Sequence, residues 1–200
     1  MYWGPLLFKC KIFPEDLKAF ADICVKDKSK DNRSNLAGVI QEEYTIDNEK
    51  FSQLISRYLH TYSAAFQAFF HQDVIGGYDI NAVWVNYMSA GEGNPIHIHE
   101  GCDLSSVLYI DMPKALQEEQ KNFKGNGAGP GGITFYNQPN VPGYIASNVF
   151  RPETGDFFMF PALLPHSVGP YTSKCERISI SANFSFKHQP KGPGGNVHKR

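Results

Sequence analysis

The stretch that decides the fold is residues 83–111, VWVNYMSAGEGNPIHIHEGCDLSSVLYID. Two apolar runs within it, Val83–Met88 and Ser106–Asp111, have the composition of β-strands. Between these runs, His97 and His99 are separated by one isoleucine. Because residues i and i+2 of a strand point to the same face, this spacing predicts two imidazoles that face the same small volume.

The same alternation predicts that Ile96 and Ile98 point the other way, into packing. Imidazole is the commonest metal-binding side chain, so a pair on one face indicates a metal site that takes a third ligand from elsewhere. Two surface histidines on an edge strand are the alternative interpretation. The pair alone does not decide between them, so the rest of the chain must.

The composition suits one soluble domain. The chain has 200 residues, of which 42% are hydrophobic, enough for a substantial core. The formal net charge of −1 argues against a broad nucleic-acid-binding surface. The four cysteines form no Cys-x-x-Cys pair, as in reduced intracellular proteins. Because neither a signal peptide nor an apolar run of membrane-spanning length is evident, we predict a cytoplasmic protein.

Helical periodicity is confined to the first part of the chain. After a short strand-like opening, a helix is predicted to start at Pro14, and Asp47 is a good N-cap for a longer helix of about six turns. Residues 29–46 read as a loop with a short strand. From residue 78 onward, strands are predicted at 80–88, 94–99, 105–111, 132–136, 144–150, 156–160, 165–170 and 176–186. Strands in this order predict a double-sheet jelly-roll or a closed barrel.

We therefore expect a single domain over residues 1–187, with helical support from residues 1–77 and a jelly-roll core over residues 78–187. Residues 188–200 are rich in Pro, Gly and Lys and are predicted to form a flexible tail. Residues 124–132, KGNGAGPGG, are predicted to form a mobile loop over the mouth of a site. They lack the Gly-Lys-Ser/Thr context of a phosphate-binding loop.

A second group of polar residues follows the aromatic stretch GDFFMFP at residues 155–161. His166 comes at the head of the next predicted strand, and Arg177 and Ser179 share one face of the last strand. An arginine that points inward needs an anion, because an unpaired buried charge is very costly. Its planar fork suits a carboxylate, to which Ser179 can donate a further hydrogen bond. A salt bridge on the barrel exterior is the alternative for Arg177.

The order His-x-His, distal His, Arg-x-Ser resembles that of the Fe(II)/2-oxoglutarate-dependent oxygenases over roughly residues 80–186. Trp-x-Asn at residues 84–86 and Val-Leu-Tyr-Ile at residues 107–110 extend the likeness. More narrowly, the motifs resemble a group of bacterial and phage oxygenases near the prolyl hydroxylases. The resemblance implies a double-stranded β-helix, the cupin-like jelly-roll, buttressed by N-terminal helices.

The resemblance also implies Fe(II) as cofactor, 2-oxoglutarate and O₂ as co-substrates, and succinate and CO₂ as products when a substrate C–H bond is hydroxylated. Its implied residues are His97, His99 and His166 for the metal; Arg177 and Ser179, with Tyr109 or Tyr87, for 2-oxoglutarate; and Trp84, Asn86 and Asp103 on the substrate side. The substrate is not identified. Fold analogy suggests a prolyl or other protein residue, and a small molecule stays open.

The chain departs from the family pattern at one ligand. Where the family has His-x-Asp/Glu, this sequence has His99 in the second position. Asp103 or Glu100 could supply an oxygen ligand instead if the loop folds back, and Asp103 could equally hold an imidazole in one tautomer. The alternatives to an oxygenase are a cupin-like three-histidine metalloenzyme that does not use 2-oxoglutarate and a non-catalytic binding protein with a decayed site.

Overall fold

The computed structural model describes residues 4–35, 37–71, 76–137 and 147–187. Within these residues the elements are β1 (Phe8–Lys11), α1 (Pro14–Asp22), the 3-10 turns η1 (Lys28–Lys30) and η2 (Arg33–Asn35), β2 (Glu42–Thr45), α2 (Asn48–Phe70), β3 (Tyr78–Met88), β4 (Asn94–His97), β5 (Leu104–Asp111), α3 (Lys114–Asn122), β6 (Ile133–Tyr136), β7 (Ser147–Phe150), β8 (Asp156–Pro161), β9 (His166–Val168) and β10 (Arg177–Phe186).

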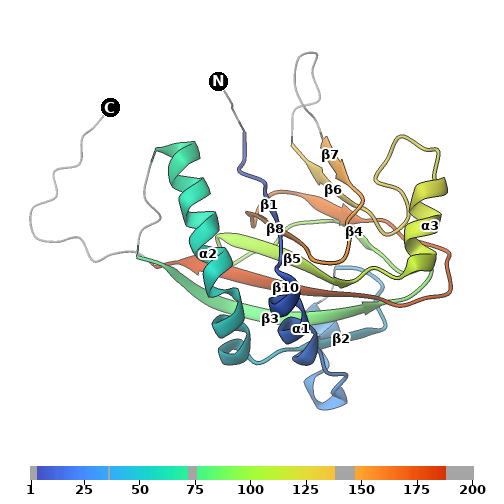
Figure 1. Cartoon of the computed structure of the whole chain (residues 1–200), viewed down its shortest axis with the longest axis horizontal. Helices are drawn as coiled ribbons and strands as arrows, with labels where there is room; N and C mark the ends of the chain where they lie inside the picture. The colour runs from blue at the N-terminus through green and yellow to red at the C-terminus, as the bar shows by residue number, and fades with distance from the viewer. Residues whose placement is uncertain (1–3, 36, 72–75, 138–146, 188–200) are drawn as a thin grey trace, which may run out of the picture.

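The strands form two antiparallel sheets, which confirms the predicted jelly-roll class (Figure 1). The larger sheet has the order β1-β8-β5-β10-β3-β2, and the smaller one β4-β9-β6-β7. β1 and β2 come from the first 77 residues, so the N-terminal segment supplies strands to the sheet as well as helical support. The predicted strand 144–150 is described only from residue 147, and the predicted tail at 188–200 lies outside the described residues.

One face of the larger sheet is apolar and is covered by α1 and α2 (Figure 1). The predicted N-cap is confirmed, because the Asp47 carboxylate accepts from the backbone N–H groups of Glu49 and Lys50 at 2.9 and 3.0 Å. The helix then buries Phe51, Ile55, Tyr58 and Tyr62 against that face. Burial of each such side chain contributes about 1.5–3 kcal/mol, so this layer fixes the sheet rigidly.

The other face of the larger sheet looks toward the smaller sheet and is divided in two. On the side of β5 and β8, aromatic and aliphatic residues such as Tyr109, Phe158 and Phe160 form a second core with Phe135 of β6. On the side of β10, β3 and β2, the residues that point inward are mainly polar and line a cavity. The site is therefore held between two packed cores. No helix among the described residues combines the length and the apolar character that a membrane span needs.

Candidate active site

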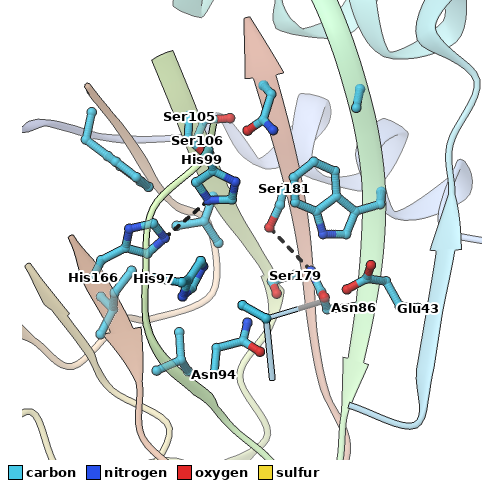
Figure 2. A pocket seen from close by; sticks show the side chains of 18 of the residues that line it. Glu43, Asn86, Asn94, His97, His99, Ser105, Ser106, His166, Ser179 and Ser181 are labelled. Atoms are coloured by element: carbon cyan, nitrogen blue, oxygen red, sulfur yellow. Dashed lines mark hydrogen bonds between the residues drawn. The ribbon is translucent and has the colours of Figure 1, made fainter. Parts of the chain in front are cut away.

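Three histidines meet at the smaller sheet. His97 at the end of β4 is the direct strand partner of His166 at the start of β9. His99 lies just beyond β4, where its backbone N–H donates to the carbonyl of Ala162 at 2.9 Å. One ligating atom from each histidine lies within 4.8 Å of the others (Figure 2). The two rings share one volume as their spacing predicted, although β4 itself ends at His97 and His99 is held by the hydrogen bond to Ala162.

The ring nitrogens are arranged as a metal site requires. The Nδ1 atoms of His97 and His166 lie 2.8 and 2.9 Å from the carbonyls of Pro95 and Leu164, so each can donate Nδ1–H and leave Nε2 free. The Nε2 atoms of His99 and His166 are 3.3 Å apart. Two nitrogens bound to one ion at about 2.0–2.2 Å lie about 2.8–3.6 Å apart over octahedral and tetrahedral geometry. The observed pair fits a shared ion.

The protonation state also favours metal binding. Burial, with the neighbouring charge of His97 as a smaller cause, lowers the pKa of His166 to about 3 and the pKa of His99 to about 4. Both imidazoles are therefore neutral near pH 7, and the neutral ring is the form that binds metals.

Neither alternative to His99 joins the cluster. The Asp103 carboxylate accepts from the backbone N–H of Phe186 at 2.8 Å, and Asp103 is not among the residues that line the cavity. Glu100 lines the cavity but is exposed and stands outside the group of converging ligand atoms. Among the described residues, the third member of the cluster is His99. Asp103 thus holds the end of β10 and does not reach the substrate side as predicted.

The cavity has a volume of about 470 Å³ and lies between the histidines and the larger sheet. Strand register places its sheet wall in rows. One row runs Glu43, Asn86, Ser179 and Tyr109 across β2, β3, β10 and β5. Figure 2 shows the histidines on one side of this cavity and Glu43 and Asn86 on the other. Trp84 lines it as well, so both candidates for the substrate side, Trp84 and Asn86, face this cavity.

Arg177 is a buried cation without a counter-ion. Its side chain is 3% exposed, its Nη1 donates to the carbonyl of Gly131 at 3.3 Å, and its Nε has no partner among the described residues. Tyr109 lies beside it, with the guanidinium carbon 5.3 Å from the ring centre, and the Tyr109 hydroxyl is buried and unpartnered. Burial lowers the pKa of Arg177. Unpaired donors of this kind need an acceptor, and a carboxylate would satisfy both at once.

Three further expectations differ from the structure. Tyr87 lies on the opposite face of the sheet, where it packs against Tyr44 beneath the Lys26 ammonium, and it is not among the residues that line the cavity. Ile96 and Ile98 are 62% and 41% exposed and not packed, because the pairing of β4 is irregular after Asn94. The predicted mobile loop at 124–132 is tied down through Gly131, whose carbonyl accepts from Arg177 and whose N–H donates to Pro170.

The structure adds residues that sequence reasoning missed. Glu43, Asn94, Asn183 and Ser105 line the cavity, and both Asn94 and Asn183 have a buried, unpartnered side-chain oxygen. Asn183 continues the alternation of Arg177 and Ser179 along β10, so the same period-2 argument could have found it. Glu43 gave no such signal, because in a short strand of alternating polar residues it reads as a solvent-facing position.

Comparison with known proteins agrees with this geometry. Residues 82–183, more than half of the chain, match a family model described as "Putative 2OG-Fe(II) oxygenase". No curated protein sequence matches significantly.

Solved structures are similar in fold at low identity. A prolyl-4-hydroxylase from Pseudomonas putida is 16% identical with a TM-score of 0.57, covering 90% of this chain and 92% of its own. The viral collagen prolyl hydroxylase of Paramecium Bursaria Chlorella virus-1, in its 2OG complex, is 14% identical with a TM-score of 0.56, covering 89% and 94%. The alpha ketoglutarate dependent epimerase SnoN from nogalamycin biosynthesis is 14% identical with a TM-score of 0.56, covering 95% and 87%. At such identities the likeness shows the fold alone.

Proposed function

We propose, because this chain belongs to the 2OG-Fe(II) oxygenase family, that it hydroxylates a C–H bond of its substrate with 2-oxoglutarate and O₂ as co-substrates. O₂ is the oxidant: bound Fe(II) would activate it, and 2-oxoglutarate would supply two of the electrons and leave as succinate and CO₂. The roles that follow concern this chain's own side chains.

His97, His99 and His166 are proposed to hold the iron through their Nε2 atoms. The backbone carbonyls of Pro95 and Leu164 fix the rings of His97 and His166 so that Nε2 faces the ion. A neutral triad leaves more positive charge on the metal than two histidines and a carboxylate do. This favours anionic co-substrate groups beside it.

Arg177 is proposed to hold the far carboxylate of 2-oxoglutarate, with Ser179 and Tyr109 as further donors. The observation that carries the proposal is the pair of buried donors without acceptors, the Nε of Arg177 and the hydroxyl of Tyr109. Ser179 is buried, is the direct strand partner of Tyr109, and lies two residues along β10 from Arg177 on the same face. A carboxylate there completes all three groups, whereas water alone leaves the guanidinium without its counter-charge.

The substrate side is proposed to be the wall of Trp84 and Asn86. By fold likeness to enzymes described as prolyl hydroxylases, a prolyl or other residue of a protein is one class of substrate, and the fold alone does not choose it. A cytoplasmic location stays a prediction from the sequence.

The test is a titration with 2-oxoglutarate in the presence of Zn(II), which is redox-silent. Arg177→Lys should weaken binding by about 2–4 kcal/mol, because lysine keeps the charge but loses the two-pronged geometry. Arg151→Lys is the matched control, since Arg151 is exposed and stacks on Phe123 outside the cavity. Unchanged affinity in Arg177→Lys would favour the cupin-like alternative. Binding without any succinate release from the Fe(II) protein, over a panel of substrates, would favour a non-catalytic protein.

A further inference from the structure

Glu43 is a second buried ionisable group in the cavity, at the far wall from the histidines (Figure 2). Its residue is 1% exposed. Oε1 accepts from the side-chain amide of Asn32 at 2.7 Å, and Oε2 has no partner among the described residues. The carboxylate is therefore satisfied on one oxygen only.

No lysine, arginine or histidine in the described part of the chain forms an ion pair with Glu43, and the charge nearest to it is the like charge of Asp31. Burying a carboxylate without a cation is costly, and its pKa rises to about 7 because burial disfavours the charged form. Such a cost at a cavity wall indicates a group whose partner comes from outside the protein.

The neighbours of Glu43 suit a cation that carries N–H groups. Asn86 is its direct partner across β2 and β3, is 5% exposed, and has a buried side-chain oxygen without a partner. The side-chain NH₂ of Asn86 donates to the Ser181 hydroxyl oxygen at 3.3 Å, so the Asn86 oxygen is the group left to accept a hydrogen bond. Trp84 shares the same face of β3 two residues earlier, and an indole face attracts an organic cation.

We propose that Glu43, Asn86 and Trp84 bind a positively charged, hydrogen-bond-donating group of the substrate, so that the substrate is an organic cation bearing a guanidinium or ammonium group. This names the substrate class of the proposed oxygenase and therefore rests on that function. A prolyl ring within a peptide has neither a positive charge nor an N–H group to offer Glu43. A basic side chain or a free amine has both.

Direct binding tests the proposal without turnover. The chain has two tryptophans, Trp3 and Trp84, so Trp3→Phe leaves Trp84 as the only indole and its fluorescence as the readout. The protein with Zn(II) and 2-oxoglutarate is titrated into the millimolar range with L-arginine and L-lysine. Their neutral matches are N-acetyl-L-citrulline amide and N-acetyl-L-norleucine amide, because free L-citrulline and L-norleucine still carry an α-ammonium group. N-acetyl-L-arginine amide distinguishes a basic residue in a peptide from a free amino acid.

We expect saturable binding of at least one cation, and binding of its neutral match weaker by about tenfold or more. Glu43→Gln should weaken the binding of the cation by roughly 10- to 100-fold, as the loss of a charge-assisted hydrogen bond does. Glu42→Gln is the matched control, because Glu42 lies on the same strand but pairs with Lys26 at the surface.

Three results would each overturn the proposal: equal binding of cations and neutral matches, an unchanged cation affinity in Glu43→Gln, or no saturable binding of any cation. The 2-oxoglutarate affinity of the same samples separates this failure from that of the proposed function. Tight 2-oxoglutarate binding without cation binding removes only the inference about the substrate. Cation binding without 2-oxoglutarate binding removes the oxygenase and leaves the cation site.

Discussion

The cavity has a buried arginine, Arg177, at one end and a buried glutamate, Glu43, at the other. The two residues differ in how they can be recognised from the sequence. Arg177 and Glu43 are 3% and 1% exposed, and each keeps one polar atom without a partner among the described residues. Arg177 belongs to a motif, Arg-x-Ser, that the sequence displays at a known distance from His166. Glu43 belongs to no motif and emerges only when the sheet is assembled. The comparison teaches that an unpaired buried charge marks a ligand position whether or not a motif announces it.

The largest expected effect concerns the histidine cluster, which lines the same cavity as Arg177 and Glu43. His99→Ala should reduce Zn(II) or Ni(II) affinity by more than about 100-fold, because it removes a converging ligand and not a supporting group. Asp103→Ala should leave metal affinity nearly unchanged and lower the free energy of unfolding by about 1 kcal/mol, since it loses the bond to the Phe186 backbone.

Calorimetric metal titration and denaturant unfolding of both variants measure these effects. If Asp103→Ala lost the metal while His99→Ala kept it, the assignment of His99 would be reversed. Asp103, and not His99, would then be the third metal ligand beside His97 and His166.

The fold was predictable where local patterns suffice. The period-2 runs on β3, β5, β8 and β10 and the capped amphipathic helix α2 are strong signals that tertiary packing did not override. Helix α3 was missed because its nine residues bury only Leu116 and Gln120, too few to give a period. The convergence of His97, His99 and His166 was predictable from their order. The i, i+2 spacing of His97 and His99 predicted their shared volume, although β4 itself ends at His97 and the hydrogen bond to Ala162 holds His99.

Glu43 could not have been predicted as a cavity residue. On β2 it alternates with Tyr44, whose ring packs in the core, so the pattern predicts a solvent-facing side chain. Its burial depends on other elements, because Asn94 of β4 in the smaller sheet and Asn32, between η1 and η2, line the same cavity over that face. A strand with one polar face has the same sequence pattern whether that face meets solvent or lines a cavity beneath the second sheet.

The second prediction tests the Glu43 end by pH. The pKa of Glu43 is raised to about 7 by burial, with the hydrogen bond from Asn32 opposing and the charge of Asp31 adding to the rise. A carboxyl group whose pKa is raised on folding destabilises the protein progressively between its unfolded pKa, about 4.3, and its folded pKa, and fully above it. Glu43→Gln should therefore gain stability relative to the wild type as pH rises from 5 to 8, by up to about 3 kcal/mol.

Thermal or denaturant unfolding over this pH range gives the difference in slope, which does not depend on how well the glutamine amide packs. Glu42→Gln should show no such gain, because the exposed Glu42 pairs with Lys26 and its pKa is lowered. A flat difference between Glu43→Gln and the wild type would mean that Glu43 is not a strained charge. Glu43 would then no longer resemble Arg177 as a buried charge that needs a partner.

The smallest expected effect tests Tyr109, the neighbour of Arg177. It has opposite signs for the free energy of unfolding and for the affinity for 2-oxoglutarate. Tyr109→Phe removes a buried hydroxyl that has no partner among the described residues. The free energy of unfolding of the unliganded protein should therefore stay equal or rise slightly. The affinity for 2-oxoglutarate should fall by about 1.5 kcal/mol, or roughly tenfold, because a donor to its carboxylate is lost while Arg177 and Ser179 remain.

Tyr87→Phe is the control, since Tyr87 packs on the helix-covered face and should leave the affinity unchanged. If Tyr109→Phe lost stability and kept its 2-oxoglutarate affinity, the hydroxyl would serve the fold and not a ligand. Arg177 would then need a counter-ion from elsewhere, and the two ends of the cavity would no longer be alike.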